Sequence, residues 1–155
     1  MHPAPAAALH SFQQAGEDVE FWTRELSDAE VWLRPLGLAA AGFQLRHIAG
    51  SIDRLLTYAA GGMLNETQMN YLKLEAEPGA TRASIVEQTV QALQAGQSFC
   101  RELDPETLAL PREVGRKKLP TTVGGLLIHT AEHAQRHVGQ LIVTVRVIRA
   151  LRVGS

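Results

Sequence analysis

The stretch that follows Pro120 constrains the fold most, because it contains no further proline and its apolar residues recur at helical spacing. Thr121 or Thr122 can cap the first turn of a helix there. The β-branched run Ile142-Val143-Thr144-Val145 is typical of a strand, but it continues the helical periodicity of the residues before it. We therefore predict a single long helix over residues 123–151.

Prolines and glycines divide the earlier part of the chain into three more segments with helical periodicity. We expect helices over residues 6–26, 41–60 and 83–103. Residues 104–120 are interrupted by prolines and predict a short irregular or hairpin segment before the last helix. Four long helices without a series of strands predict an all-α fold, a four-helix bundle that forms one domain over residues 1–155.

Local signals mark the ends of these segments. Ser27 and Glu30 form the S-x-x-E pattern of a capping box, which predicts a short extra turn of helix. Gly61-Gly62 can end the second long helix. We expect the residues from there to the third long helix, including Glu77-Pro78-Gly79, to form a loop.

Charge and cysteine content narrow the class of protein. Lysine and arginine number 15 and aspartate and glutamate 16, a formal net charge of −1, so no cationic field favours a nucleic acid or an anionic membrane surface. No apolar run reaches the roughly 18–20 residues of a membrane span, and the first residues lack a basic targeting region. Cys100, the single cysteine, excludes an intrachain disulfide framework and fits a reducing compartment. We expect a cytoplasmic protein with no nucleic-acid or membrane partner.

Histidines carry the functional signal. His129, His133 and His137 are spaced four residues apart on the last predicted helix, so their side chains share one face and two of them can bind one ion. His47 is the only histidine in the middle of another predicted helix. Together with two imidazoles of the last helix, it would form a neutral three-histidine site for a divalent metal, with positions open for water or substrate. Imidazole ligands suit Zn, Ni, Fe or Cu.

Two other interpretations of these regularly spaced histidines compete with a three-histidine site. The histidines could be polar residues on a helix face, although several buried imidazoles would each need a hydrogen-bond partner. His129 to His133 also spells H-x-x-E-H, a metallopeptidase motif. That motif needs a further ligand, usually a downstream carboxylate, and no Asp or Glu follows Glu132. Glu132 and Arg136 instead predict an ion pair on the surface of the helix.

Further candidates lie near this predicted site. Arg54 and Tyr58 share a face of the second long helix with His47 and could bind a substrate or cofactor, the first through an anionic group and the second as a pocket wall. A surface arginine and a core tyrosine are the alternatives. The basic cluster, Arg112 with Arg116-Lys117-Lys118, is either a solvated loop or a lid over the metal that attracts a carboxylate. We expect Cys100 to be buried and inert.

Two segments together resemble the DinB-like superfamily of four-helix metalloproteins. They are Phe43-Gln44-Leu45-Arg46-His47-Ile48-Ala49 and, some 80 residues later, His129-x3-His133-x3-His137-Val138-Gly139-Gln140. Trp32-Leu33-Arg34-Pro35 and Thr121-Thr122-Val123-Gly124-Gly125 extend the resemblance over most of the chain. It implies an up-down-down-up bundle that is usually a homodimer.

The resemblance also implies a ligand set. His47, His133 and His137 would bind Zn, Ni or a similar divalent ion. His129 would lie one turn back, beside the ligands or in the wall of the pocket. Gly139 and Gln140 would pack and hydrogen-bond rather than bind the ion.

Members that resemble this chain include S-transferases that use bacillithiol or mycothiol, a thiol-dependent maleylpyruvate isomerase, and proteins described as metal-dependent hydrolases. An open metal position could deprotonate a low-molecular-weight thiol, or lower the pKa of bound water to about 7. We therefore expect a metal-dependent S-transferase acting on a small electrophilic substrate. The alternatives are a metal-dependent hydrolase and a non-enzymatic, stress-related metal-binding protein whose ion fastens the second helix to the last.

Overall fold

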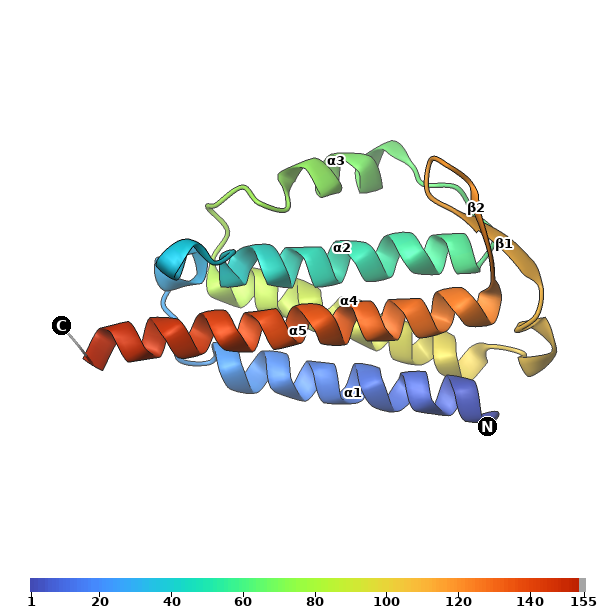
Figure 1. Cartoon of the computed structure of the whole chain (residues 1–155), viewed down its shortest axis with the longest axis horizontal. Helices are drawn as coiled ribbons and strands as arrows, with labels where there is room; N and C mark the ends of the chain where they lie inside the picture. The colour runs from blue at the N-terminus through green and yellow to red at the C-terminus, as the bar shows by residue number, and fades with distance from the viewer. Residues whose placement is uncertain (154–155) are drawn as a thin grey trace.

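Four long helices form the body of the protein: α1 (Pro3–Thr23), α2 (Ala41–Ala59), α4 (Arg82–Glu102) and α5 (Val123–Val153). In the computed structural model, which describes residues 1–153, α2 packs against α4 and α5, and α1 packs against the same two helices. Helices α1 and α5 run one way along the long axis, and α2 and α4 run the other way (Figure 1). The predicted helical class is confirmed, with a small two-stranded sheet added to it.

The apolar faces of these helices meet in one core. Each long helix buries side chains that are three or four residues apart. One fully buried side chain from each helix is Phe12 of α1, Leu45 of α2, Leu93 of α4 and Leu141 of α5. Burying a side chain of this size stabilises the fold by about 1.5–3 kcal/mol. The ring of Phe12 fits against α4 because a Cβ at Gly96 would lie only 3.1 Å from it.

The helix ends agree with the sequence prediction to within a few residues. Helix α1 begins at Pro3 rather than residue 6, because proline is favoured in a first turn and the His2 side chain accepts a hydrogen bond from the Ala4 amide. It ends at Thr23 rather than residue 26. Helix α5 is continuous through residues 142–145, so the helical interpretation of the β-branched run is confirmed.

The connection from α1 to α2 contains two short 3₁₀ turns, Glu30–Trp32 and Pro35–Gly37. The predicted capping box is present: the Ser27 amide donates to Glu30 Oε2 at 2.9 Å, and the Glu30 amide donates to Ser27 Oγ at 3.2 Å. The Trp32 indole donates to the Ala80 carbonyl at 2.8 Å, and its ring lies where a Cβ at Gly42 would come within 2.8 Å. This connection is therefore fastened to the starts of both α2 and α4.

The segment expected to be a loop after α2 contains a further helix, α3 (Glu66–Leu74), so that expectation is wrong. Asn65 and Gln68 form a reciprocal capping box at its start. The Gln68 side chain also donates to Asp53 Oδ2 at 2.9 Å and to Thr57 Oγ1 at 2.8 Å on α2. These contacts hold α3 along the outer side of α2 (Figure 1).

A short 3₁₀ turn (Pro105–Thr107) and an antiparallel hairpin precede α5, as the sequence predicts. Strands β1 (Pro111–Val114) and β2 (Leu119–Thr122) pair with Pro111 opposite Thr122. Arg112 Nε donates to the Ala59 carbonyl at 2.8 Å and so fastens the hairpin to the end of α2. Within residues 1–153, no helix combines the length and the apolar character that a membrane crossing needs.

Candidate metal centre

Three histidines from two helices meet at the contact between α2 and α5. His47 comes from α2, and His133 and His137 come from successive turns of α5. One ring nitrogen of each lies within 4.8 Å of the other two, and Nε2 of His47 lies 3.0 Å from Nε2 of His133. All three residues are partly buried, so the cluster is sheltered but reachable from solvent.

The donor set fits a divalent ion. Two imidazole nitrogens that share an ion at about 2.0–2.1 Å lie about 3.0–3.4 Å apart, and the distance between His47 Nε2 and His133 Nε2 agrees with this. Burial, and then the neighbouring His47, lowers the pKa of both His133 and His137 to about 4. Both rings are therefore neutral near pH 7, which is the form that binds a metal.

Glu75 orients the ring of His47 from outside the cluster. His47 Nδ1 lies 2.7 Å from Glu75 Oε2, so the ring donates its Nδ1 hydrogen to the carboxylate and keeps a lone pair on Nε2. Glu75 is only 2% exposed and directly follows α3. Its other oxygen accepts from Arg54 Nη1 at 2.8 Å, and Arg54 is itself 8% exposed. The buried carboxylate of Glu75 is thus paired with the cation of Arg54 and also accepts the hydrogen bond that orients His47.

Gly50 provides the space for this arrangement. A Cβ at this position of α2 would lie 2.5 Å from Glu75 Oε1 and 2.7 Å from Arg54 Nη1. Both distances are shorter than a non-bonded contact allows. A glycine in the middle of α2 therefore accounts for the close approach of Glu75 to the helix.

His137 is oriented in a similar way by Gln44 of α2. Its Nδ1 donates to Gln44 Oε1 at 2.6 Å, and Gln44 Nε2 donates to Gln140 Oε1 at 3.0 Å. Gln44 is 2% exposed, so this chain of amides is well shielded. His133 differs, since its Nδ1 is buried without a hydrogen-bond partner among residues 1–153. Its orientation depends on contacts with the neighbouring rings.

The remaining predicted site residues lie at different distances from the cluster. Arg54 belongs to the network around it through Glu75. His129 is exposed, with its ring centre 5.6 Å from that of His133 and its Nδ1 3.2 Å from Glu132 Oε1. Tyr58 lies further along α2 and lines a cavity beside the hairpin. Their predicted roles in binding a substrate or cofactor stay predictions.

The metallopeptidase interpretation gains no support from the position of Glu132. Its side chain is 54% exposed and lies 3.9 Å from Arg136 Nη2, as expected for a surface ion pair. Three basic residues of the hairpin, Arg112, Arg116 and Lys118, line a cavity near the end of α2, and none of the three histidines lines it. Cys100 is buried, and burial raises the pKa of its thiol to about 11, so it is a poor nucleophile.

Sequence reasoning did not identify Glu75. The signal that could have found α3 was the N-x-x-Q pattern of Asn65 and Gln68, a variant of the capping box. No local pattern shows that the end of this helix docks against His47.

The structure is thus that of a mostly helical protein whose antiparallel α2 and α5 bring three histidines together. A model of the DinB superfamily matches residues 11–141, and the chain belongs to this superfamily. A conserved protein from Enterococcus faecalis has a similar structure, with a TM-score of 0.77 and 14% identity, over 97% of this chain and 99% of the other. A protein from Exiguobacterium sibiricum, described as a member of the DinB family, has a TM-score of 0.72 and 17% identity, over 96% of this chain and 93% of its own. No protein of curated function matches this sequence.

Proposed function

We propose that this protein binds a divalent metal ion, Zn or Ni, through His47, His133 and His137, and that it is a metal-dependent thiol S-transferase acting on a small electrophile. The observation that carries the metal site is the approach of the three imidazoles to within 4.8 Å of one another. Two of these rings are aimed by buried partners, Glu75 and Gln44. Such outer partners are a regular feature of metal-binding histidines.

We favour a catalytic ion over a structural ion because of the number of protein ligands in the cluster. Among residues 1–153, no fourth His, Cys, Asp or Glu joins the cluster, whereas a structural zinc ion has four protein ligands. A bound ion would supply Lewis acidity at a position left open by the imidazoles, where it would lower the pKa of a thiol.

The chain's own residues would prepare this position. Glu75 and Gln44 would hold the rings of His47 and His137 in the ligand tautomer, with Nε2 unprotonated. The side chain of His47 is 20% exposed, so a small molecule could reach the cluster from solvent. The resemblance to the superfamily further supports an up-down-down-up order of α1, α2, α4 and α5, and a homodimer. The single cysteine supports a reducing, cytoplasmic location.

Metal content tests the site. We expect purified protein to carry about one divalent ion per chain, and His133→Ala to lose it. His129→Ala is the matched control, because His129 lies one turn away on the same helix but outside the cluster. Equal metal content in all three proteins would overturn the proposed site.

A conjugation assay tests the activity. Glutathione-like thiols, including bacillithiol and mycothiol, would be mixed with monochlorobimane, where the thiol sulfur displaces chloride and a proton is released. We expect conjugation that stops with a chelator and returns with Zn or Ni. Metal-dependent ester hydrolysis without conjugation would instead favour the hydrolase.

A further inference from the structure

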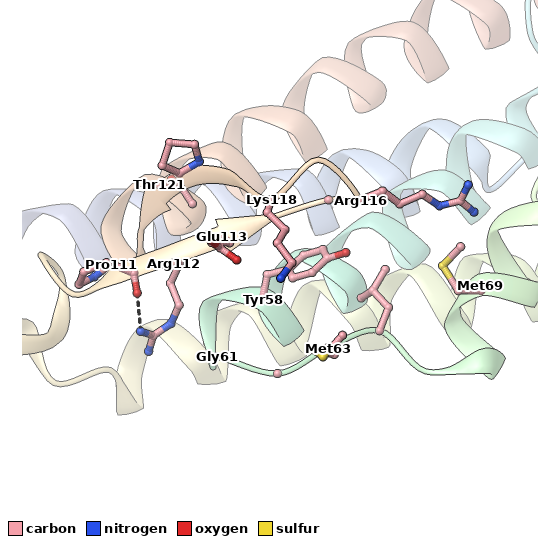
Figure 2. Close-up of a pocket in the computed structure, with 14 residues that line it drawn as sticks. Tyr58, Gly61, Met63, Met69, Pro111, Arg112, Glu113, Arg116, Lys118 and Thr121 are labelled. Atoms are coloured by element: carbon pink, nitrogen blue, oxygen red, sulfur yellow. Dashed lines mark hydrogen bonds between the residues drawn. The ribbon is translucent and has the colours of Figure 1, made fainter.

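A cavity of about 730 Å³ lies between the β-hairpin and the segment that joins α2 to α3 (Figure 2). Its volume is within the range of about 300–1,000 Å³ that is usual for small-molecule sites. Tyr58, the α2 residue that lines it, is eleven positions from His47, or about 16 Å along a helix. None of the three histidines lines it, so this cavity is separate from the metal centre.

The two sides of the cavity differ in character. Apolar side chains from the α2–α3 segment and α3 form one side: Met63, Leu64 and Met69. Methionine side chains are flexible and adapt to ligands of different shape. The hairpin forms the other side and contributes three cationic side chains and one carboxylate: Arg112, Arg116, Lys118 and Glu113.

The Arg112 side chain already forms hydrogen bonds within the protein. Its Nε donates to the Ala59 carbonyl at 2.8 Å, and its Nη1 donates to the Pro111 carbonyl at 2.9 Å. The first of these carbonyls is at the negative end of α2, where a cation is favourable. Arg112 therefore attaches the hairpin to the helix and is not available as the main contact for a ligand.

Arg116 and Lys118 have no such role. Both are exposed, and in the part of the chain that the structure describes no carboxylate lies within ion-pair distance of either. Glu113, the one carboxylate of the cavity, forms no ion pair with them. In Figure 2 the Lys118 side chain extends toward Tyr58, and the Arg116 side chain extends toward Met69. Lys117, between them in sequence, does not line the cavity.

We propose that this cavity binds an amphipathic organic anion, whose acid group contacts Arg116 and Lys118 and whose apolar body packs on Leu64 and Met69. Two cations that form no ion pair within residues 1–153 provide the attraction for the acid, and an arginine can bind a carboxylate or phosphate through two hydrogen bonds. The apolar side would be covered by the body of the ligand. This site is independent of the proposed metal chemistry.

Titration of ¹⁵N-labelled protein with octanoate, octyl phosphate and 1-octanol tests the proposal. We expect the amide signals of Gly61, Gly62 and Gly115 to shift with at least one acid, which binds at least tenfold more tightly than the alcohol. The tighter acid identifies the head group as a carboxylate or a phosphate. Equal affinity for 1-octanol, or shifts elsewhere, would overturn the anionic site.

Two variants make the test specific. Arg116→Gln with Lys118→Gln should weaken binding of the acid at least tenfold, whereas Lys117→Gln, a matched loss of charge in the same turn, should change it less than twofold. Equal melting temperatures would show that both proteins are folded. Chelator-treated protein and His133→Ala should bind the acid as the unmodified protein does; loss of binding in either would place the acid at the metal and overturn the proposal.

Discussion

The carboxylate of Glu75 accepts the Nδ1 hydrogen of His47 at 2.7 Å, although the two residues belong to different helical segments, 28 positions apart. This hydrogen bond links α3 to the histidine cluster, and Arg54, about two turns further along α2 than His47, donates to the other oxygen of the Glu75 carboxylate. A helix outside the four-helix body thus orients a residue inside it.

Replacing Glu75 should weaken metal binding without removing a ligand. Glu75→Gln can still accept from His47, but it lacks the charge that offsets Arg54, so we expect zinc affinity to fall about 10- to 100-fold. Competition with a chromophoric chelator measures this. Glu77→Gln is the control, because Glu77 is exposed and lies two residues away. Equal affinity in both variants would contradict the orienting role of Glu75.

Gly50→Ala should destabilise the protein even though alanine favours helices. The added Cβ would lie 2.5 Å from Glu75 Oε1 and would displace the pair with Arg54. We expect a loss of about 1–3 kcal/mol in the free energy of unfolding, measured by urea denaturation. Gly139→Ala in α5 meets nothing within 4 Å and should instead stabilise the protein by about 0.5–1 kcal/mol. Equal effects of the two substitutions would show that Gly50 has no packing role.

How far the sequence predicts this structure depends on how far apart the interacting residues lie along the chain. The spacing of His133 and His137 follows from helix geometry, which is local, so their shared face could be read directly. That His47 meets them depends on the antiparallel packing of α2 and α5, and it was suggested by its position in a predicted helix and by the resemblance to the DinB-like superfamily. Glu75 could not be found, because its position depends on the docking of α3 through Gln68, a contact between segments that have no shared pattern.

Glu30 should make stability depend on acidity. Its carboxylate accepts two hydrogen bonds of 2.5 Å from Arg152 near the end of α5, and the Ser27 amide also donates to it. These contacts lower the pKa of Glu30 from 4.5 to about 2. A lowered pKa means that the stabilisation is present above pH 4.5 and is lost as the pH falls toward 2.

The comparison of Glu30→Gln with the unmodified protein isolates this contribution. Their melting temperatures should differ above pH 5 and converge between pH 4.5 and 2, since protonation of Glu30 then has the same effect as the substitution. The difference should be modest, because the pair is partly exposed and salt weakens it. A constant difference across this range would show that Glu30 does not titrate as the geometry implies.

Removal of the metal should lower stability but leave the protein folded. The buried core runs through α1, α2, α4 and α5 and includes Leu45 and Leu141, so folding does not depend on the three imidazoles alone. With zinc at 100 times its dissociation constant, the free energy of unfolding should rise by about 2.7 kcal/mol. Circular dichroism with and without a chelator measures both the helical content and the free energy of unfolding. His133→Ala should show no response to the chelator. Complete unfolding on chelation would instead mean that the ion is structural, and it would contradict an open catalytic position.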